Sequence, residues 1–327
     1  MSPRDPDIRE VLESIGELGY ISVSGGALTE ALPPRENVFA RGPGDRWTPT
    51  IRYLNDYAAN HPDWRGEFFV CLYDGWREYS QPVDEAQRRY VRWKDVDRRH
   101  FLGVGSQNEP RFRHRHEDAR IYPVMPLPVL TYDRHIGDRN ALLIPDYEFV
   151  LTRYAPQLDQ VRTGDIPWSA KKRKVAWRGR RNVSEGYAHF DHGRGPQHPR
   201  DVAVAFSKRR NLAQVLDAAF NHKPIAWMLK HRYILDIDGM TTSWSGCYWK
   251  LSSNSLVWRV RTHWEQWYFD RLVPGRHYVV LDDFFHVEEL FAWCERNEQQ
   301  CRAMVAAANA VMRKMTYEYS VSGYTIR

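Results

Sequence analysis

The chain has 327 residues, of which 43% are hydrophobic and 13% aromatic, and its formal net charge at pH 7 is +6. This length accommodates two domains of ordinary size, and the hydrophobic content excludes a disordered chain. Because it has no apolar run of about 18 residues and no apolar signal core, we expect a cytoplasmic protein without an integral membrane segment. Its four cysteines have no metal-ligand spacing and are too few for a disulfide framework.

The first half of the chain alternates helical and strand patterns. A cap-like threonine and a proline begin a predicted helix at 48–60, and an apolar run at 67–73 predicts a strand that ends at Asp74-Gly75. A charged helix is predicted over 83–96 and a loop over 97–120. Short strands are predicted over 127–132 and 142–144.

In the second half, a polar stretch with proline and glycine at 154–172 predicts a crossover between domains. The remaining predictions are strands over 174–177, 215–219, 233–237 and 255–260, a loop over 183–203, a short helix over 264–268, and helices over 287–297 and 299–315. Strands alternating with helices twice over predict an α/β fold with two Rossmann-like domains that face a cleft.

We assign residues 1–160 to an N-terminal acceptor-side domain and 161–300 to a C-terminal nucleotide-binding domain. Residues 301–327 form a C-terminal helix and tail, for which a return to the N-terminal domain is an open alternative.

The segment after the 233–237 strand has the pattern of a nucleotide site. Asp238-Gly239 is a turn signal, and small hydroxyl residues precede the next helix. In an α/β sheet, such a loop exposes backbone N–H groups at the carboxyl ends of the strands, where phosphate-bearing ligands bind. The candidate donor-binding residues here are Asp238, Gly239, Thr242, Ser243, Trp244, Ser245, Gly246, Cys247, Tyr248 and Lys250.

Arginines follow the 174–177 strand. Gly179 allows close approach of the backbone to a ligand, and an arginine offers a planar fork of donors to phosphate oxygens. We therefore predict that Arg181 contacts a diphosphate and that Arg178 lies alongside it or is structural. The basic run at 171–174 is typical of a solvated loop more often than of an RNA or nuclear-localisation site, so we expect no nucleic-acid partner.

Asp236 and Asp238 form a D-x-D pattern, in which alternation along a strand brings both carboxylates to the same side. Two such carboxylates can hold a divalent ion on a diphosphate. Asp238 also suits a turn-capping role, which we favour, so no metal site is predicted.

The order D-x-D-G, W-S-G, S-N-S-L-V and P-x-x-H-Y-V within residues 232–281, together with Val175–Arg181, resembles glycosyltransferase family 90. A weaker likeness lies at 68–74. That family includes fungal capsule-associated proteins, lipopolysaccharide-modifying transferases and Rumi-type protein O-glucosyltransferases. The resemblance implies a GT-B fold and an inverting, metal-independent transfer of glucose or xylose from UDP-glucose or UDP-xylose to a hydroxyl of a glycan or protein. It implies no cofactor besides the donor substrate.

The resemblance also implies roles for single residues. Asp74, at the end of an N-terminal strand, matches the family's catalytic base, although a turn-forming aspartate beside Gly75 is the alternative. His277 matches the family's His-Tyr pair, as a ligand contact or a structural histidine. From its place in the 264–268 helix, Glu265 is a candidate ribose partner, although core packing explains most of that segment.

One position departs from the family. Many relatives have Ser-Gly-Arg where this chain has Ser245-Gly246-Cys247, and their arginine contacts the diphosphate. Lys250 or Arg180 is the expected replacement for that charge. The missing arginine also supports a second hypothesis, a non-catalytic protein on the same scaffold that binds a nucleotide, a glycan or RNA.

Overall fold

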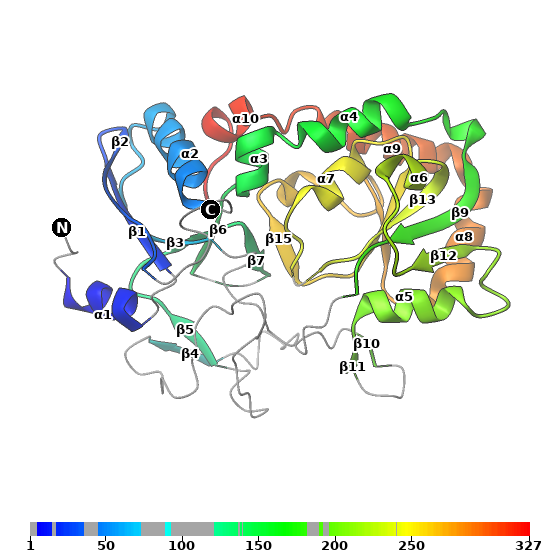
Figure 1. The fold of residues 1–327 in the computed structure, drawn as a ribbon, viewed down its shortest axis with the longest axis horizontal. Helices are drawn as coiled ribbons and strands as arrows, with labels where there is room; N and C mark the ends of the chain where they lie inside the picture. Colours follow the sequence, from blue (N-terminus) through cyan, green and yellow to red (C-terminus); the bar gives the residue numbers. More distant parts are fainter. Residues whose placement is uncertain are drawn as a thin grey trace.

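The structure is a computed structural model that describes residues 5–14, 18–35, 45–72, 89–92, 121–136, 138, 140–181, 190–191, 196–239 and 241–327. It confirms the α/β class, with one five-stranded sheet built from each half of the chain (Figure 1). In the described part of the chain, no helix combines the length and apolarity needed to cross a bilayer.

The C-terminal sheet has the strand order β12-β9-β13-β14-β16, and all of its strand pairs are parallel. Its strands are β9 (Lys172–Arg178), β12 (Leu216–Ala219), β13 (His231–Asp236), β14 (Leu256–Val260) and β16 (Val279–Leu281). The helices around it are α4 (Ala155–Gly164), α5 (Pro199–Ser207), α6 (Ile225–Met228), α7 (Ser245–Leu251), α8 (Val287–Arg296) and α9 (Glu298–Met312).

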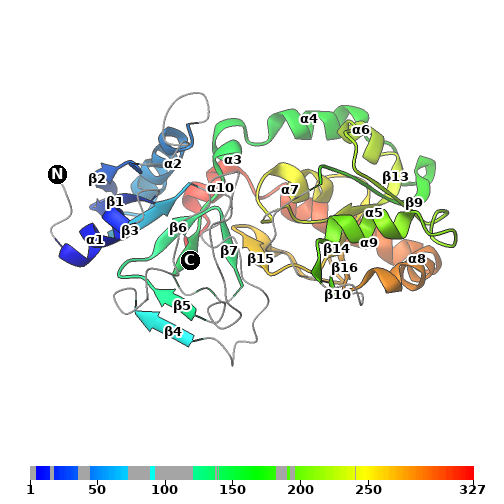
Figure 2. The same ribbon diagram turned by 60° about the horizontal axis from the view of Figure 1, so that its bottom comes forward.

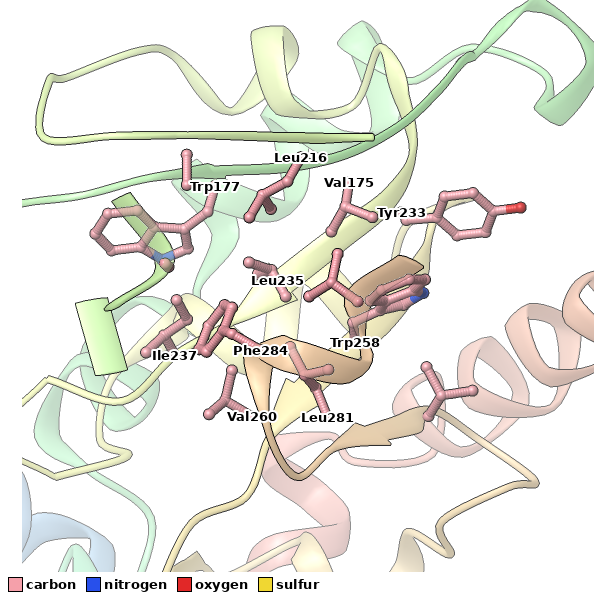
Figure 3. Close-up of a cluster of buried hydrophobic side chains, with 14 of the residues drawn as sticks. Val175, Trp177, Leu216, Tyr233, Leu235, Ile237, Trp258, Val260, Leu281 and Phe284 are labelled. Atoms are coloured by element: carbon pink, nitrogen blue, oxygen red, sulfur yellow. The ribbon is translucent and has the colours of Figure 1, made fainter. Parts of the chain in front are cut away.

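Both faces of the C-terminal sheet are covered, because successive side chains on a strand point to opposite faces. On one face, Tyr233 and Leu235 pack with Trp258 and with apolar residues of α5, α8 and α9 (Figure 3). On the other face, Ile234 packs with residues of α4, α6 and α7, among them Trp249. Burial on both sides explains why these strands read as continuous apolar runs in the sequence.

The N-terminal sheet has the order β2-β1-β3-β6-β8 and is mixed. β1 pairs antiparallel with both β2 and β3, whereas the β3–β6 and β6–β8 pairs are parallel. Helix α2 (Trp47–Asn60) covers one face and α1 (Pro6–Ser14) the other. The strands are β1 (Leu18–Ser24), β2 (Ala27–Leu32), β3 (Gly66–Cys71), β6 (Val129–Thr131) and β8 (Ala141–Leu143), and α3 (Tyr147–Thr152) follows β8.

Several contacts join the two halves of the chain. Strand β7 (Asp133–His135) pairs antiparallel with β15 (Trp264–Gln266), and α10 (Tyr317–Ser322) lies against α2 (Figures 1 and 2). Near the end of the chain, Tyr324 Oη donates to the Leu143 carbonyl. Residues 316–327 thus contact the N-terminal sheet, while the division into domains stays a prediction.

The elements predicted at 48–60, 67–73, 127–132, 142–144, 174–177, 215–219, 233–237, 255–260, 287–297 and 299–315 are confirmed within a few residues at their ends. Three other predictions, over 83–96, 183–203 and 264–268, are wrong in part. Residues 89–92 form β4 (Arg89–Arg92), because they pair with the distant β5 (Ile121–Val124); the rest of the predicted 83–96 helix lies outside the described residues. Residues 264–266 are a strand because β7 pairs with them.

The polar stretch 154–172 contains α4, whose buried Val161 packs under α6 and α7 while its other side faces solvent. The loop predicted over 183–203 ends earlier than expected, because His198 caps α5 and the helix begins at Pro199. Short strands β10 (Phe190–Asp191) and β11 (Pro196–Gln197) pair just before it. All four cysteines are free and buried.

Candidate functional site

The strand order of the C-terminal sheet creates one topological switch point. β12 follows β9 in the chain and lies on one side of it, whereas the next strand, β13, lies on the other side. Connections therefore leave the carboxyl ends of β9 and β13 in opposite directions, and we expect a ligand-binding crevice outside those ends, as is general for open α/β sheets. Residues 179–181 follow β9 and residues 237–239 follow β13, so both predicted donor segments meet at this crevice.

Arg178 is structural. Its Nη2 donates to Asp217 Oδ1 at 2.7 Å, its Nη1 donates to the Asp217 carbonyl at 2.7 Å, and its guanidinium lies 3.9 Å from the Trp227 ring centre. Gly179 leaves room for a neighbouring ring, because a Cβ there would lie 2.6 Å from the Trp177 ring. The residues at the carboxyl end of β9 are therefore tightly packed.

Arg181 is two-thirds exposed and its Nε donates to Asp201 Oδ1 at 2.8 Å. Arg180 is also exposed. Both residues directly follow β9, and Asp201, in the first turn of α5, fixes the direction of the Arg181 side chain.

Arg200 is a residue of this crevice that the sequence reasoning missed. Its Nη1 donates to the Arg180 carbonyl at 3.1 Å and its Nη2 to the Ile237 carbonyl at 3.4 Å. These carbonyls lie just beyond β9 and β13, so the guanidinium spans the switch point. A proline directly after His198 indicates the start of a helix, so the sequence contained a signal that Arg200 lies in the first turn of a helix.

His198 joins α5 to the loop after β13. Its Nδ1 accepts from Arg200 N at 3.1 Å, and its Nε2 lies 3.2 Å from the Gly239 carbonyl. These partners assign the neutral tautomer with the proton on Nε2. Burial, together with the charge of Arg200, lowers the pKa of His198 to about 4, so the ring is neutral near pH 7.

The loop before α7 carries local strain at Trp244. This residue has φ 78° and ψ 179°, a region that is essentially restricted to glycine and that costs about 1–3 kcal/mol for other residues. The Arg46 guanidinium lies 4.7 Å from the Trp244 ring centre, and Tyr147 meets the same ring edge-on at 5.0 Å. Contacts from the N-terminal half therefore hold the strained residue.

Arg46 also reaches the end of β3. Its Nη1 donates to the Leu72 carbonyl at 2.8 Å, and the residue is 5% exposed. Leu72 precedes Asp74 by two positions, and Asp74 itself lies outside the described residues. One buried guanidinium thus contacts both the end of β3 and the residue that precedes α7.

The hydroxyl residues of the loop bond among themselves. Thr241 Oγ1 and Ser243 Oγ are 2.7 Å apart, and Thr242 is buried with its Oγ1 accepting from Arg259 Nη2 at 3.0 Å. Ser245 begins α7 and is buried, whereas a Cβ on the next residue, Gly246, would meet no atom within 4 Å. The start of α7 at Gly246 therefore borders open space.

Beneath this loop lies a buried cluster of four charges. Lys250 Nζ donates to Asp236 Oδ1 at 2.7 Å, and Arg259 lies 3.8 Å from Asp236 and 3.9 Å from Asp238. Burial by itself would raise the pKa of Asp236, but Lys250 and Arg259 hold that pKa below its usual range. Burial raises the pKa of Asp238, and Arg259 offsets this only in part. The D-x-D carboxylates thus face side-chain cations.

The same charge cluster lies beside Cys247, the position at which this sequence differs from many relatives. Arg259 Nη1 lies 3.3 Å from Cys247 Sγ, so a guanidinium from β14 stands beside the position where many relatives have an arginine. Lys250, one of the two expected replacements for that arginine, is buried and paired with Asp236. In the described residues, no group of three or more His, Cys, Asp and Glu side chains has an arrangement that could hold a metal ion.

The remaining candidates have structural partners. His277 is buried and its Nδ1 accepts from Val273 N at 2.8 Å. Glu265 forms an ion pair with Arg134 at 2.8 Å across the β7–β15 pair, and Tyr248 Oη donates to the Met315 carbonyl at 2.7 Å. In the N-terminal half, Asp146 caps α3 by accepting from Phe149 N, and burial raises its pKa to about 6.

Comparison with protein families matches residues 101–327 to Glycosyl transferase family 90. A relative with a described activity, O-glucosyltransferase LpsA of Dichelobacter nodosus, is 28% identical over 212 residues, which is 62% of this chain. The chain spans 61% of the length of that relative. The family match includes the whole C-terminal sheet and its crevice, and it begins after Asp74. The chain therefore belongs to glycosyl transferase family 90.

Proposed function

We propose that this protein is a glycosyltransferase that moves a sugar from a nucleotide donor to a hydroxyl of a glycan or protein. The observation that carries the proposal is the switch point within the family-matched region, where the arginines that follow β9 lie beside the loop that follows β13. A donor diphosphate has the charge and size that such an edge accommodates.

In this proposal the donor binds to residues 161–300 and the acceptor to residues 1–160, in a GT-B arrangement, with residues 301–327 as a C-terminal helix and tail. Arg181 contacts the diphosphate, and Ser243 and Gly246 offer hydroxyl or backbone donors, whereas the Gly239 N–H donates to the Thr241 carbonyl. The buried residues Thr242, Cys247, Tyr248 and Lys250 support the loop from beneath.

The donor is a UDP-sugar, with glucose favoured over xylose because the similar protein from Dichelobacter nodosus is named an O-glucosyltransferase. Transfer does not require a metal ion in this proposal. The pairing of Asp236 with Lys250, and the approach of Arg259 to both aspartates, support that view, because the carboxylates already have cationic partners.

Asp74 is the proposed base of an inverting reaction. The acceptor oxygen attacks the anomeric carbon from the face opposite the diphosphate, and its proton passes to the Asp74 carboxylate. The bond from the anomeric carbon to the diphosphate oxygen breaks, and the nucleoside diphosphate leaves with the electron pair. Cationic side chains at the crevice stabilise the negative charge that develops there.

Transfer activity is measured with UDP-glucose and UDP-xylose, candidate acceptors and mass detection of the product. Asp74→Asn keeps the side-chain shape but cannot accept the proton, so we expect the rate to fall by about 10²–10⁴-fold. UDP binding and the melting temperature stay at parent values. A variant that retains more than about a tenth of the parent rate is incompatible with Asp74 as the base. An unfolded variant instead identifies Asp74 as a turn residue.

The second candidate function, a non-catalytic binding protein, is favoured by the cysteine at position 247. The same assay separates the two functions, because a binding protein gains thermal stability with UDP but yields no transferred sugar. Activity that is lost with EDTA and restored by manganese contradicts the metal-independent proposal.

A further inference from the structure

Arg200 is placed where the negative charge of a donor is expected. The switch point lies between the carboxyl ends of β9 and β13, and the guanidinium bonds one carbonyl beyond each of these strands, Arg180 O and Ile237 O. It also lies close to the loop after β13, since Nη2 is 3.1 Å from the position that a Cβ on Gly239 would occupy. Any larger residue at position 239 would push this guanidinium aside.

The surroundings of Arg200 are positively charged overall. The segments at this edge, residues 177–181, 198–201, 216–219 and 237–239, contain four arginines and three aspartates. Asp217 pairs with Arg178, Asp201 pairs with Arg181, and Asp238 lies 3.9 Å from Arg259. The neutral His198 beside it adds no charge. An anion in this crevice would therefore meet a net positive field.

The two carbonyl bonds also orient the guanidinium. Nη1 and Nη2 each bond a different strand end, so the plane of the fork is fixed across the crevice. A guanidinium has five N–H donors in a planar arrangement that matches phosphate oxygens. A group held in this way loses little side-chain entropy when a ligand binds.

We propose that Arg200 binds the diphosphate of the nucleotide donor at the switch point, from its position between the ends of β9 and β13. This inference rests on the proposed function and adds a residue to its donor site. Arg181, which is two-thirds exposed, then has the smaller share of the diphosphate affinity, because solvent screens its charge.

Isothermal titration calorimetry with pyrophosphate, UDP and uridine tests the proposal on the full chain. In Arg200→Gln we expect the Kd for pyrophosphate and UDP to rise by about 10- to 100-fold, the effect of losing a charge-assisted bond. The Kd for uridine stays within about threefold of the parent value. Arg200→Lys keeps the charge without the fork, so its Kd for pyrophosphate rises by about tenfold. Arg209→Gln, an exposed arginine just beyond the same helix, is the control and behaves as the parent.

Equal losses for UDP and uridine in a folded Arg200→Gln variant show that Arg200 only holds the strand ends, and the proposal then fails. If Arg200→Gln does not fold, the Arg200→Lys variant tests the proposal instead. An Arg200→Lys variant that binds pyrophosphate with the parent affinity overturns the proposal. A parent protein that binds pyrophosphate through Arg200 but binds UDP no more tightly than pyrophosphate refutes the UDP-sugar function alone. UDP binding that is unchanged in the variants refutes the role of Arg200 alone. A parent that binds neither pyrophosphate nor UDP refutes both.

Discussion

The two five-stranded sheets of this protein differ in strand direction and in burial. The C-terminal sheet is parallel throughout and its strand β14 is buried at every position. In the N-terminal sheet, β2 is an antiparallel edge strand in which no residue is fully buried. All five carboxyl ends of the parallel sheet meet at one edge, whereas in the N-terminal sheet β1 runs opposite to β2, β3, β6 and β8, so its carboxyl end lies at the other edge.

The charges at these two edges also differ. Arginines 178, 180, 181 and 200 gather at the carboxyl edge of the C-terminal sheet, while Asp133 and Asp146 are buried just beyond β6 and β8. Asp74, which follows β3, lies outside the described residues. The comparison teaches that the arginines at the C-terminal edge are partly neutralised by Asp201, Asp217, Asp236 and Asp238, whereas the N-terminal edge holds buried carboxylates beside the buried Arg46.

The largest predicted effect concerns burial in the two sheets. Trp258 in β14 is fully buried, so Trp258→Ala is expected to lower the free energy of unfolding by about 3–5 kcal/mol. Leu28→Ala in edge strand β2 removes a half-buried side chain and costs about 1 kcal/mol. Urea denaturation measures both. Similar losses for the two variants contradict the difference in burial between the sheets.

The next prediction compares a buried ion pair with a partly exposed one. Asp236→Asn leaves Lys250 and Arg259 buried without one carboxylate, and we expect a loss of about 3 kcal/mol. Glu265→Gln breaks the partly exposed pair with Arg134 and costs less than about 1 kcal/mol. Stability curves in denaturant distinguish the two. A small loss for Asp236→Asn indicates that the charge cluster is solvated rather than buried.

The third prediction compares how a titratable residue at each sheet edge makes the stability of the protein depend on pH. The pKa of His198 is about 4 in the folded protein and 6.5 ordinarily, so the unfolded chain binds more protons between these values. His198 therefore makes the protein lose stability as pH falls from 6.5 to 4, by about 2–3 kcal/mol. His198→Asn keeps a capping side chain and removes this loss, which denaturation at several pH values measures.

Asp146, at the edge of the N-terminal sheet, makes stability depend on pH in the opposite direction. Its pKa is raised from 3.8 to about 6, so its contribution is present below pH 3.8 and is lost as pH rises through 6. Asp146→Asn therefore improves stability at pH 7 relative to pH 4, whereas His198→Asn improves it at pH 4 relative to pH 7. Variants that shift the pH profile in the same direction contradict this assignment.

The smallest prediction concerns the open space at the start of α7. Gly246→Ala adds a Cβ that meets no atom within 4 Å, so we expect a gain of about 0.4–1 kcal/mol in stability from a less flexible unfolded chain. Gly275→Ala also meets open space but has φ +74°, and it is expected to destabilise. If the donor approaches the backbone at Gly246, the stabilised variant binds UDP more weakly than the parent. Unchanged UDP affinity places the donor elsewhere on this edge.

Local sequence predicted much of the fold because the strands of the C-terminal sheet are apolar on both faces and turn residues follow them. The Asp238-Gly239 turn after β13 and the start of α7 near the hydroxyl residues were visible in this way. Strands β4 and β15 were misread as helical because their partners, β5 and β7, are distant in the sequence. The role of Arg200 was hidden for the same reason, since its contacts are with strand ends 20 and 37 residues away.

The sequence by itself determined the α/β class, the likeness to the family and the two segments that meet at the switch point, because periodicity and turn chemistry are local properties. Only the tertiary structure decided which charges are available to a ligand. Burial beside Asp236 commits Lys250 to that carboxylate, and Arg178 is bonded to Asp217. Ion pairing and desolvation depend on residues brought together by folding, so a charge that looks free in the sequence can already have its partner.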